Sequence, residues 1–233
     1  TALLVRMLHG TLEGISDARL FGGGNLCAIG DGAPGTWELI QFRDAQLVDK
    51  ETYAVSHRLR GQLGTERDQV WPTGSYLVRL DGTPQQIDLK ESHLGLERHY
   101  RVGPGSRPVD DPAYTHAVLA FDGIGLRPLS PVHLRLSGSP GKARTATWVR
   151  RTRVGGDLWG PMDVPLAEES ERYMVRVLQA QTVLREEVVT SAEWVYDLSA
   201  QSADGVSGAF TLEVAQVSAS FGPGIFARVS AVA

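Results

Sequence analysis

The sequence predicts an all-β protein organised in two domains. Apolar residues fall on alternate positions in many short segments, which is the spacing of a β-strand with one buried face. Turns rich in glycine, proline and aspartate separate these segments, and the second half contains no convincing helix. Prolines around residue 128 hold the backbone extended between the two series of strands. We therefore expect a first β domain at residues 1–128 and a second at residues 129–233.

The clearest strand signal lies in the stretch WELIQFRDAQLVDKETYAVSHRLRGQLGTERD, which predicts a β-hairpin. Tyr53, Val55 and Leu59 alternate along its second strand, and His57 falls on the same face. The apolar parity of its first strand changes near Asp44, which indicates a bulge or a bend. We expect this hairpin to be the centre of a mixed or antiparallel sheet. We expect the histidine to be half-buried and hydrogen-bonded rather than catalytic.

More strands follow this hairpin in the first half. One segment places Tyr76 and Val78 on a common face, and the Asp-Gly turn after it predicts a return strand at residues 85–89. Shorter extended segments are expected at residues 99–102 and 117–121.

The second half predicts a sandwich of about seven short strands. One cysteine, Cys27, excludes an intrachain disulfide, so a fibronectin type III-like sandwich is a better choice than a disulfide-linked immunoglobulin domain. Trp148 is expected to be its core aromatic residue. The expected strands include residues 145–154, 173–178, 182–190, 193–197, 210–218 and 225–232.

Charge and composition exclude several classes of function. The net charge is −4 and both signs are mixed along the chain, so neither half has the basic surplus typical of nucleic-acid binding. No apolar run approaches the roughly 20 residues of a membrane span. The chain starts without methionine or a signal-peptide pattern, which we interpret as a fragment of a longer polypeptide. Any catalytic domain of that polypeptide would lie elsewhere.

No residue pattern identifies a catalytic or metal site. There is no GxSxG elbow, and no pair of carboxylates stands out as a glycosidase pair. His93 and His99, with Asp110 and Asp111, have uneven spacing in loops, so we interpret them as solvated residues rather than metal ligands. We assign no catalytic residue, metal or cofactor.

Two groups of residues are candidates for binding. Trp71 and Trp159 stand in turns beside prolines, where an indole either stacks on a sugar ring or caps the end of a core. The arginines of the hairpin and of the segment TATWVRRTRV are expected on charged faces that could contact a neighbouring subunit. These candidate subunit contacts are Arg58, Arg60, Arg151 and Arg153.

Several blocks of the sequence resemble one known family. They are WELIQFRDAQLV…RLRGQLGTE, HYRVGPGSRPVDDPA, GLRPLSPVHL, TATWVRRTRVGGDLW…VPLAEESERYMVRV and FTLEVAQVSASFGPG. Together, in this order, they resemble the C-terminal part of the large tail-tip protein of gene transfer agents and siphophage tails. This baseplate protein is called the megatron or host-specificity protein, and it is often labelled a glycoside-hydrolase TIM-barrel-like tail protein.

The resemblance implies a tail-hub-like first domain and a non-enzymatic structural role in a phage-like tail tip. It also implies a homotrimer that contacts the tail hub and distal tail proteins, assembled in the bacterial cytoplasm and released on lysis. The TIM-barrel-like part would lie upstream of this chain. Two alternatives stay open: a carbohydrate-binding module for host capsule or lipopolysaccharide, and a glycan hydrolase.

Overall fold

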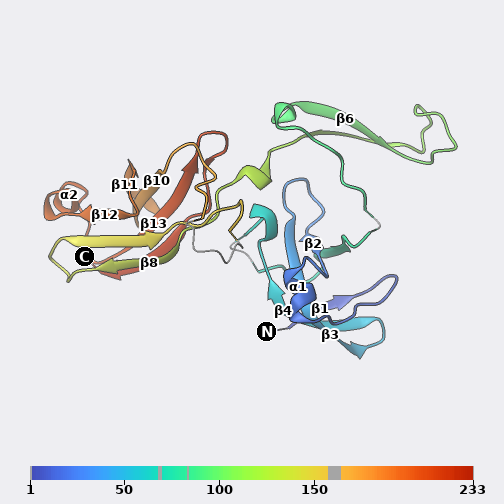
Figure 1. The fold of residues 1–233 in the computed structure, drawn as a ribbon, viewed down its shortest axis with the longest axis horizontal. Helices are drawn as coiled ribbons and strands as arrows, with labels where there is room; N and C mark the ends of the chain where they lie inside the picture. The colour runs from blue at the N-terminus through green and yellow to red at the C-terminus, as the bar shows by residue number, and fades with distance from the viewer. Residues whose placement is uncertain (1, 68–69, 83, 157–163, 233) are drawn as a thin grey trace. The chain divides into compact units, whose positions relative to one another are not determined.

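The computed structural model describes residues 2–67, 70–82, 84–156 and 164–232. It divides the chain into two compact units, Thr1–Ile124 and Gly125–Ala233. Both units are built on antiparallel β-sheets, which confirms the predicted all-β class (Figure 1). In the described part of the chain, no helix is long and apolar enough to cross a membrane.

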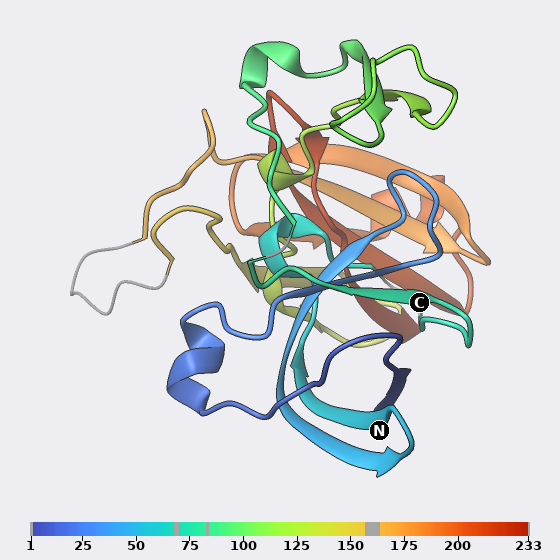
Figure 2. The ribbon, with the colours of Figure 1, turned by 90° about the vertical axis from the view of Figure 1, so that its right-hand side faces the viewer.

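The first unit is built on a five-stranded antiparallel sheet in the order β1-β4-β3-β2-β5. The predicted hairpin supplies its two long central strands, which curve together (Figure 2). A 3-10 turn, η1 (Gln62–Gly64), follows the hairpin. The strands are β1 (Leu3–Arg6), β2 (Cys27–Gly30), β3 (Glu38–Asp49), β4 (Thr52–Leu59) and β5 (Tyr76–Arg79).

The irregular positions of the hairpin differ from the prediction. Its register shifts only between Leu47 and Asp49, beside the turn, so the register shows no bulge near Asp44, where a bulge or a bend was predicted. His57 has a φ of 49°, in the left-handed region, and its side chain is 62% exposed. This residue was predicted to be half-buried with Val55. The left-handed backbone breaks the alternation on which that prediction depended.

Strand β5 pairs with β2 rather than with a return strand. The register runs from Cys27↔Arg79 to Gly30↔Tyr76, and residues 85–89 form no strand. Tyr76 is 60% exposed, whereas Leu77 packs against the core. Pairing with a strand 50 residues earlier in the sequence is a tertiary choice that the local Asp-Gly turn does not reveal.

The core of the first unit is built from strands β1 to β4 of this sheet and from Leu12 in the segment before the first helix. A short helix, α1 (Asp17–Phe21), adds Leu20 to the buried residues, and the Ser16 side chain caps its N-terminus. Gly22, the first residue of the glycine run, is the C-cap of this helix. The main cluster comprises Val5, Leu12, Cys27, Ile29, Ile40, Phe42, Tyr53 and Val55.

A two-stranded ribbon follows in the same unit. Strands β6 (Glu97–Val102) and β7 (Thr115–Ala120) pair with each other, and no other described strand pairs with them. Only Tyr100 and Ala117 are half-buried; the remaining residues of both strands are exposed. The short 3-10 turns η2 (Glu91–His93) and η3 (Ile124–Leu126) stand before and after the ribbon in sequence.

The second unit is a sandwich of two antiparallel sheets. One sheet has the order β12-β9-β8, and the other has the order β11-β10-β13 with β14 and β15 pairing to β13. This arrangement of three strands against four main strands is that of a fibronectin type III domain. The strands are β8 (Val132–Ser137), β9 (Arg144–Val149), β10 (Tyr173–Gln179), β11 (Thr182–Val189), β12 (Glu193–Tyr196), β13 (Ala209–Ser218), β14 (Gly222–Pro223) and β15 (Ala227–Val232).

Aromatic residues from both sheets form the core of the sandwich. Trp148 is 4% exposed and packs edge-on against Tyr173, with ring centroids 5.2 Å apart, which confirms its predicted core position. Tyr196 meets Phe210 in a similar edge-on contact. An unpredicted short helix, α2 (Leu198–Ala203), begins at Asp197, whose carboxylate accepts a hydrogen bond from the Ala200 N–H.

Candidate functional site

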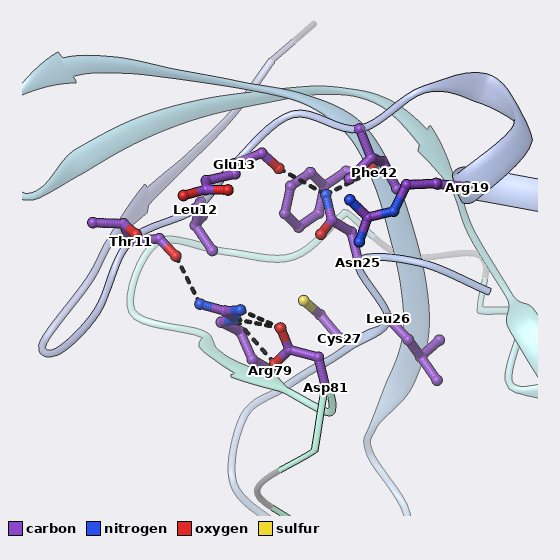
Figure 3. A pocket seen from close by; sticks show the side chains of 11 residues that line it. Thr11, Leu12, Glu13, Arg19, Asn25, Leu26, Cys27, Phe42, Arg79 and Asp81 are labelled. Carbon is purple, nitrogen blue, oxygen red and sulfur yellow. Dashed lines mark hydrogen bonds and ion pairs between the residues drawn. The ribbon is translucent and has the colours of Figure 1, made fainter. Parts of the chain in front are cut away.

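A polar hollow of about 220 Å³ lies in the first unit. Its wall combines the segment of residues 11–15, the helix α1, the start of β2, Phe42 of β3 and the end of β5 (Figure 3). Such a small volume suits a single small polar group rather than a drug-sized molecule.

Hydrogen bonds between distant segments hold the wall of the hollow together. Arg79 donates to the Thr11 carbonyl at 2.7 Å and forms an ion pair with Asp81. The hydrogen bonds from this guanidinium hold the pKa of the aspartate below its usual value. On the opposite side, the Asn25 amide donates to the carbonyls of Glu13 at 2.8 Å and Phe42 at 3.2 Å. These hydrogen bonds fix the segments that form the wall of the hollow.

Cys27 lies at the inner side of the hollow and is 1% exposed. Figure 3 shows its sulfur atom directed toward the middle of the labelled side chains. Burial, and then the nearby Asp81 carboxylate, raise the pKa of the thiol to about 11. The group is therefore a thiol rather than a thiolate at neutral pH, and it acts as a buried small side chain. The hollow offers hydrogen bonds, not an activated nucleophile.

Glu38 forms a second polar centre at the beginning of the hairpin, and it binds two of the candidate residues. Its carboxylate is fully buried and accepts hydrogen bonds from Arg60 at 3.0 and 2.7 Å, and from the Gly61 N–H at 3.0 Å. The Trp71 indole N–H donates to the same carboxylate at 2.7 Å. One buried acid thus fixes the strand, the turn after the hairpin and the tryptophan.

Two of the candidate residues, Trp71 and Arg60, donate hydrogen bonds to this buried acid. Trp71 is half-buried and packs against the core cluster, so it caps the end of a core, which is one of its two sequence interpretations. Arg60 holds the buried acid from within the same unit, although 40% of its side chain stays exposed. Arg58 is half-buried on β4, opposite Phe42. A subunit contact through these two arginines stays a prediction.

The candidates of the second unit lie beyond the end of β9. This strand ends at Val149, so the alternation that would place Arg151 and Arg153 in solvent does not continue to them. Both are half-buried. Arg151 donates to the Ser130 carbonyl at 2.6 Å, and Arg153 pairs with the buried Glu168 at 3.0 Å. Their predicted solvent-facing position was wrong, and their role in a subunit contact stays a prediction. Trp159 lies outside the described residues.

Two polar features of the structure were missed by sequence reasoning. Nothing in the sequence distinguishes Glu38 from the other carboxylates, because its four donors lie 22 to 33 residues away. The second is a pair of histidines on the ribbon, His99 and His116, whose facing ring nitrogens are 3.0 Å apart. Only the ribbon register could have indicated this pair.

Comparison with known proteins gives a partial match to one family. The family described as "Rcc01698-like, C-terminal" matches residues 1–78. No curated protein matches the sequence.

Several solved structures are similar to this chain at low identity. FN3tt is 14% identical, covering 44% of this chain and 89% of its own, with a TM-score of 0.30. Rat CD45 extracellular domains d3–d4 are 11% identical, covering 82% and 94%, with a TM-score of 0.35. The chicken CNTN1 FN1–FN3 domains are 14% identical, covering 94% and 59%, with a TM-score of 0.32. The strand order of the second unit by itself identifies its fibronectin type III-like fold.

Proposed function

We propose that this chain is a non-enzymatic structural module of a phage-like tail tip, the C-terminal part of a baseplate protein of the gene transfer agent type. The family match over residues 1–78 fits this proposal, as do the two all-β units. The observation that carries it is the ribbon β6–β7. In a larger assembly, neighbouring subunits would cover a ribbon of this kind.

Within the described part of the chain, the outer edges and most apolar side chains of the ribbon are uncovered. A single two-stranded hairpin is marginally stable in water, because it lacks a third strand or a layer packed on its face. Here both outer edges lack a strand partner, and apolar residues such as Val102, Val118 and Leu119 are 40–72% exposed. Exposed edges and apolar side chains are the features that a neighbouring subunit would cover.

The proposed partners follow from the resemblance stated above. They are further copies of the same protein in a homotrimer, together with the tail hub and distal tail proteins. Such a particle would be assembled in the bacterial cytoplasm and released on lysis. In this role the ribbon contributes contact area between subunits.

The test uses the intact parent protein purified with its tail partners. Leu119→Asp adds a charge to the exposed ribbon and is expected to reduce incorporation into trimeric tips, measured by cryo-electron microscopy and sedimentation. The matched control is Val195→Asp, which adds the same charge at an exposed position of β12, in the sandwich. Loss of incorporation in the control alone, or an intact parent that forms no trimeric tip, would contradict the proposal.

Recognition of host capsule or lipopolysaccharide is the alternative proposal. It has less support at Trp71, because the indole N–H is committed to Glu38 and the ring packs against the core. This alternative requires saturable binding of host polysaccharide that is weaker in Trp71→Phe. That variant keeps the core contact but removes the N–H donor. Hydrolysis of glycan by the isolated chain would overturn the non-enzymatic part of the proposal.

A further inference from the structure

The ribbon carries a pair of histidines that the strand register brings together. His99 lies opposite Val118, and His116 lies opposite Arg101, so the two histidines are diagonal neighbours on one face of β6–β7. Nδ1 of His99 and Nε2 of His116 are 3.0 Å apart, and the two ring planes differ by 7°. Both side chains belong to exposed residues, so ions in solution can reach them.

The separation of these two nitrogens is close to what a shared metal ion requires. Zinc binds imidazole nitrogen at about 2.0–2.1 Å, which places two nitrogens of a tetrahedral site about 3.3 Å apart. At a right angle between the two bonds, the same bond length gives about 2.9 Å. The rings need only rotate about their exposed side-chain bonds to aim both lone pairs at one point between them.

The neighbouring charges permit a cation at this position. On the same face, Glu97 precedes His99 by two residues and contributes a negative charge, whereas Arg101 directs its guanidinium to the Val109 carbonyl at 3.1 Å. Arg98 alternates to the opposite face. Among the described residues, no group of three or more histidine, cysteine, aspartate or glutamate side chains is placed to hold a metal. The protein would therefore supply two ligands, and water would complete the coordination.

We propose that His99 and His116 form a two-histidine site for a divalent transition-metal ion, with Zn²⁺ as the representative case. In the metal-free pair, one facing nitrogen carries a hydrogen and the other carries a lone pair. On binding, this hydrogen moves to the outward nitrogen of its own ring, so both facing nitrogens become neutral donors to the metal. No proton leaves a pair that is neutral at the start. No oxidant or reductant is required.

A metal ion held by both histidines would link strand β6 to strand β7. A metal that binds only the paired strands stabilises them by RT ln(1 + L/Kd), where L is the free metal concentration, so the stabilisation grows as L rises above Kd. In the described part of the chain, the ribbon is a two-stranded hairpin without a covering layer. A metal link between its strands would therefore stabilise the ribbon more than a comparable link would stabilise the sandwich. The inference is independent of the tail-tip proposal, because it concerns the isolated chain and is read out without any assembly.

The test is titration of the tag-free chain with ZnCl₂ in an isothermal calorimeter. We expect saturable binding of one ion per chain, weakened about tenfold or more by His99→Ala and by His116→Ala, because each removes one of two ligands. His9→Ala is the matched control, since it removes an exposed histidine outside the ribbon, and it should leave the affinity unchanged. No saturable binding, or equal binding in all variants, would overturn the site.

Hydrogen exchange supplies a second measurement that a loose surface ion would not change. In the wild type, Zn²⁺ should slow amide exchange in β6 and β7, and it should leave β10 and β13 unaffected. The same addition should change nothing in His99→Ala, whose fold is checked by far-UV circular dichroism. Slowing that persists in His99→Ala, or wild-type exchange that does not respond to Zn²⁺, would show that the histidine pair does not hold the metal.

Discussion

The ribbon of the first unit and the sandwich of the second are both antiparallel β-structure, yet their side chains have opposite environments. In β10 and β13 of the sandwich, residues such as Tyr173 and Leu212 are completely buried between two sheets. In β6 and β7, no second layer of the described chain covers the strands, and no core residue lies on them. The comparison teaches that strand pairing alone does not bury apolar surface. A second packed layer supplies most of the stabilisation.

The largest expected effect compares one leucine from each region. Leu212→Ala removes a fully buried side chain from the sandwich and should lower the free energy of unfolding by about 4 kcal/mol. Leu119→Ala on the 40%-exposed ribbon position should change it by less than about 0.5 kcal/mol in the isolated chain. Urea unfolding followed by far-UV circular dichroism measures both. Equal destabilisation would mean that the ribbon has a core of its own.

A smaller effect is expected at the polar centre of the first unit. Glu38→Gln leaves Arg60 without its buried carboxylate and should destabilise that unit by about 3 kcal/mol. Glu13→Gln is the matched control, because Glu13 is exposed, and it should be nearly neutral. Thermal unfolding of both variants tests this. A neutral Glu38→Gln would mean that hydrogen bonding, rather than charge, holds the turn after the hairpin.

The smallest effect concerns the acid stability of the sandwich. Asp204 is 8% exposed and accepts hydrogen bonds from Arg185 and Tyr196. Burial raises its pKa, but these hydrogen bonds outweigh burial, so the pKa of the folded state lies below the ordinary value. The contribution is therefore complete above the unfolded pKa of about 3.9 and is lost as the pH falls through the folded pKa.

The melting temperature of the second unit should therefore fall on acidification below about pH 4. Asp204→Asn removes this titration, so its melting temperature should respond less to the same change of pH. Scanning calorimetry at several pH values measures the difference between the two proteins. An identical pH response would show that other carboxylates account for the acid sensitivity of the sandwich.

Alternation of apolar residues predicted the sandwich more completely than it predicted the first unit. Tyr173, Val175 and Val177 alternate with half-buried residues because one face of β10 meets the opposing sheet and the other is covered less. In this strand, the alternation of apolar residues in the sequence matches the alternation of burial in the structure. In the first unit, Tyr76 and Val78 show the same period yet point away from the core, so the period gave the strand but not its buried face.

Features that depend on distant residues could not be obtained in this way. The pairing of β5 with β2, the donors of Glu38 and the diagonal contact between His99 and His116 all join segments far apart in the sequence. Likewise, the left-handed backbone at His57 has no signature in that residue type. None of these leaves a local pattern to find.

What the sequence by itself determined is the all-β class, the central hairpin, most strands of the sandwich and the core position of Trp148. These follow from side-chain period and turn residues, which are properties of a few neighbouring positions. Only the tertiary structure decided which strands pair, which face of each strand is buried and which polar groups meet. Those outcomes depend on closing long loops and on matching whole surfaces, and each is settled by the sum of many contacts rather than by any one segment.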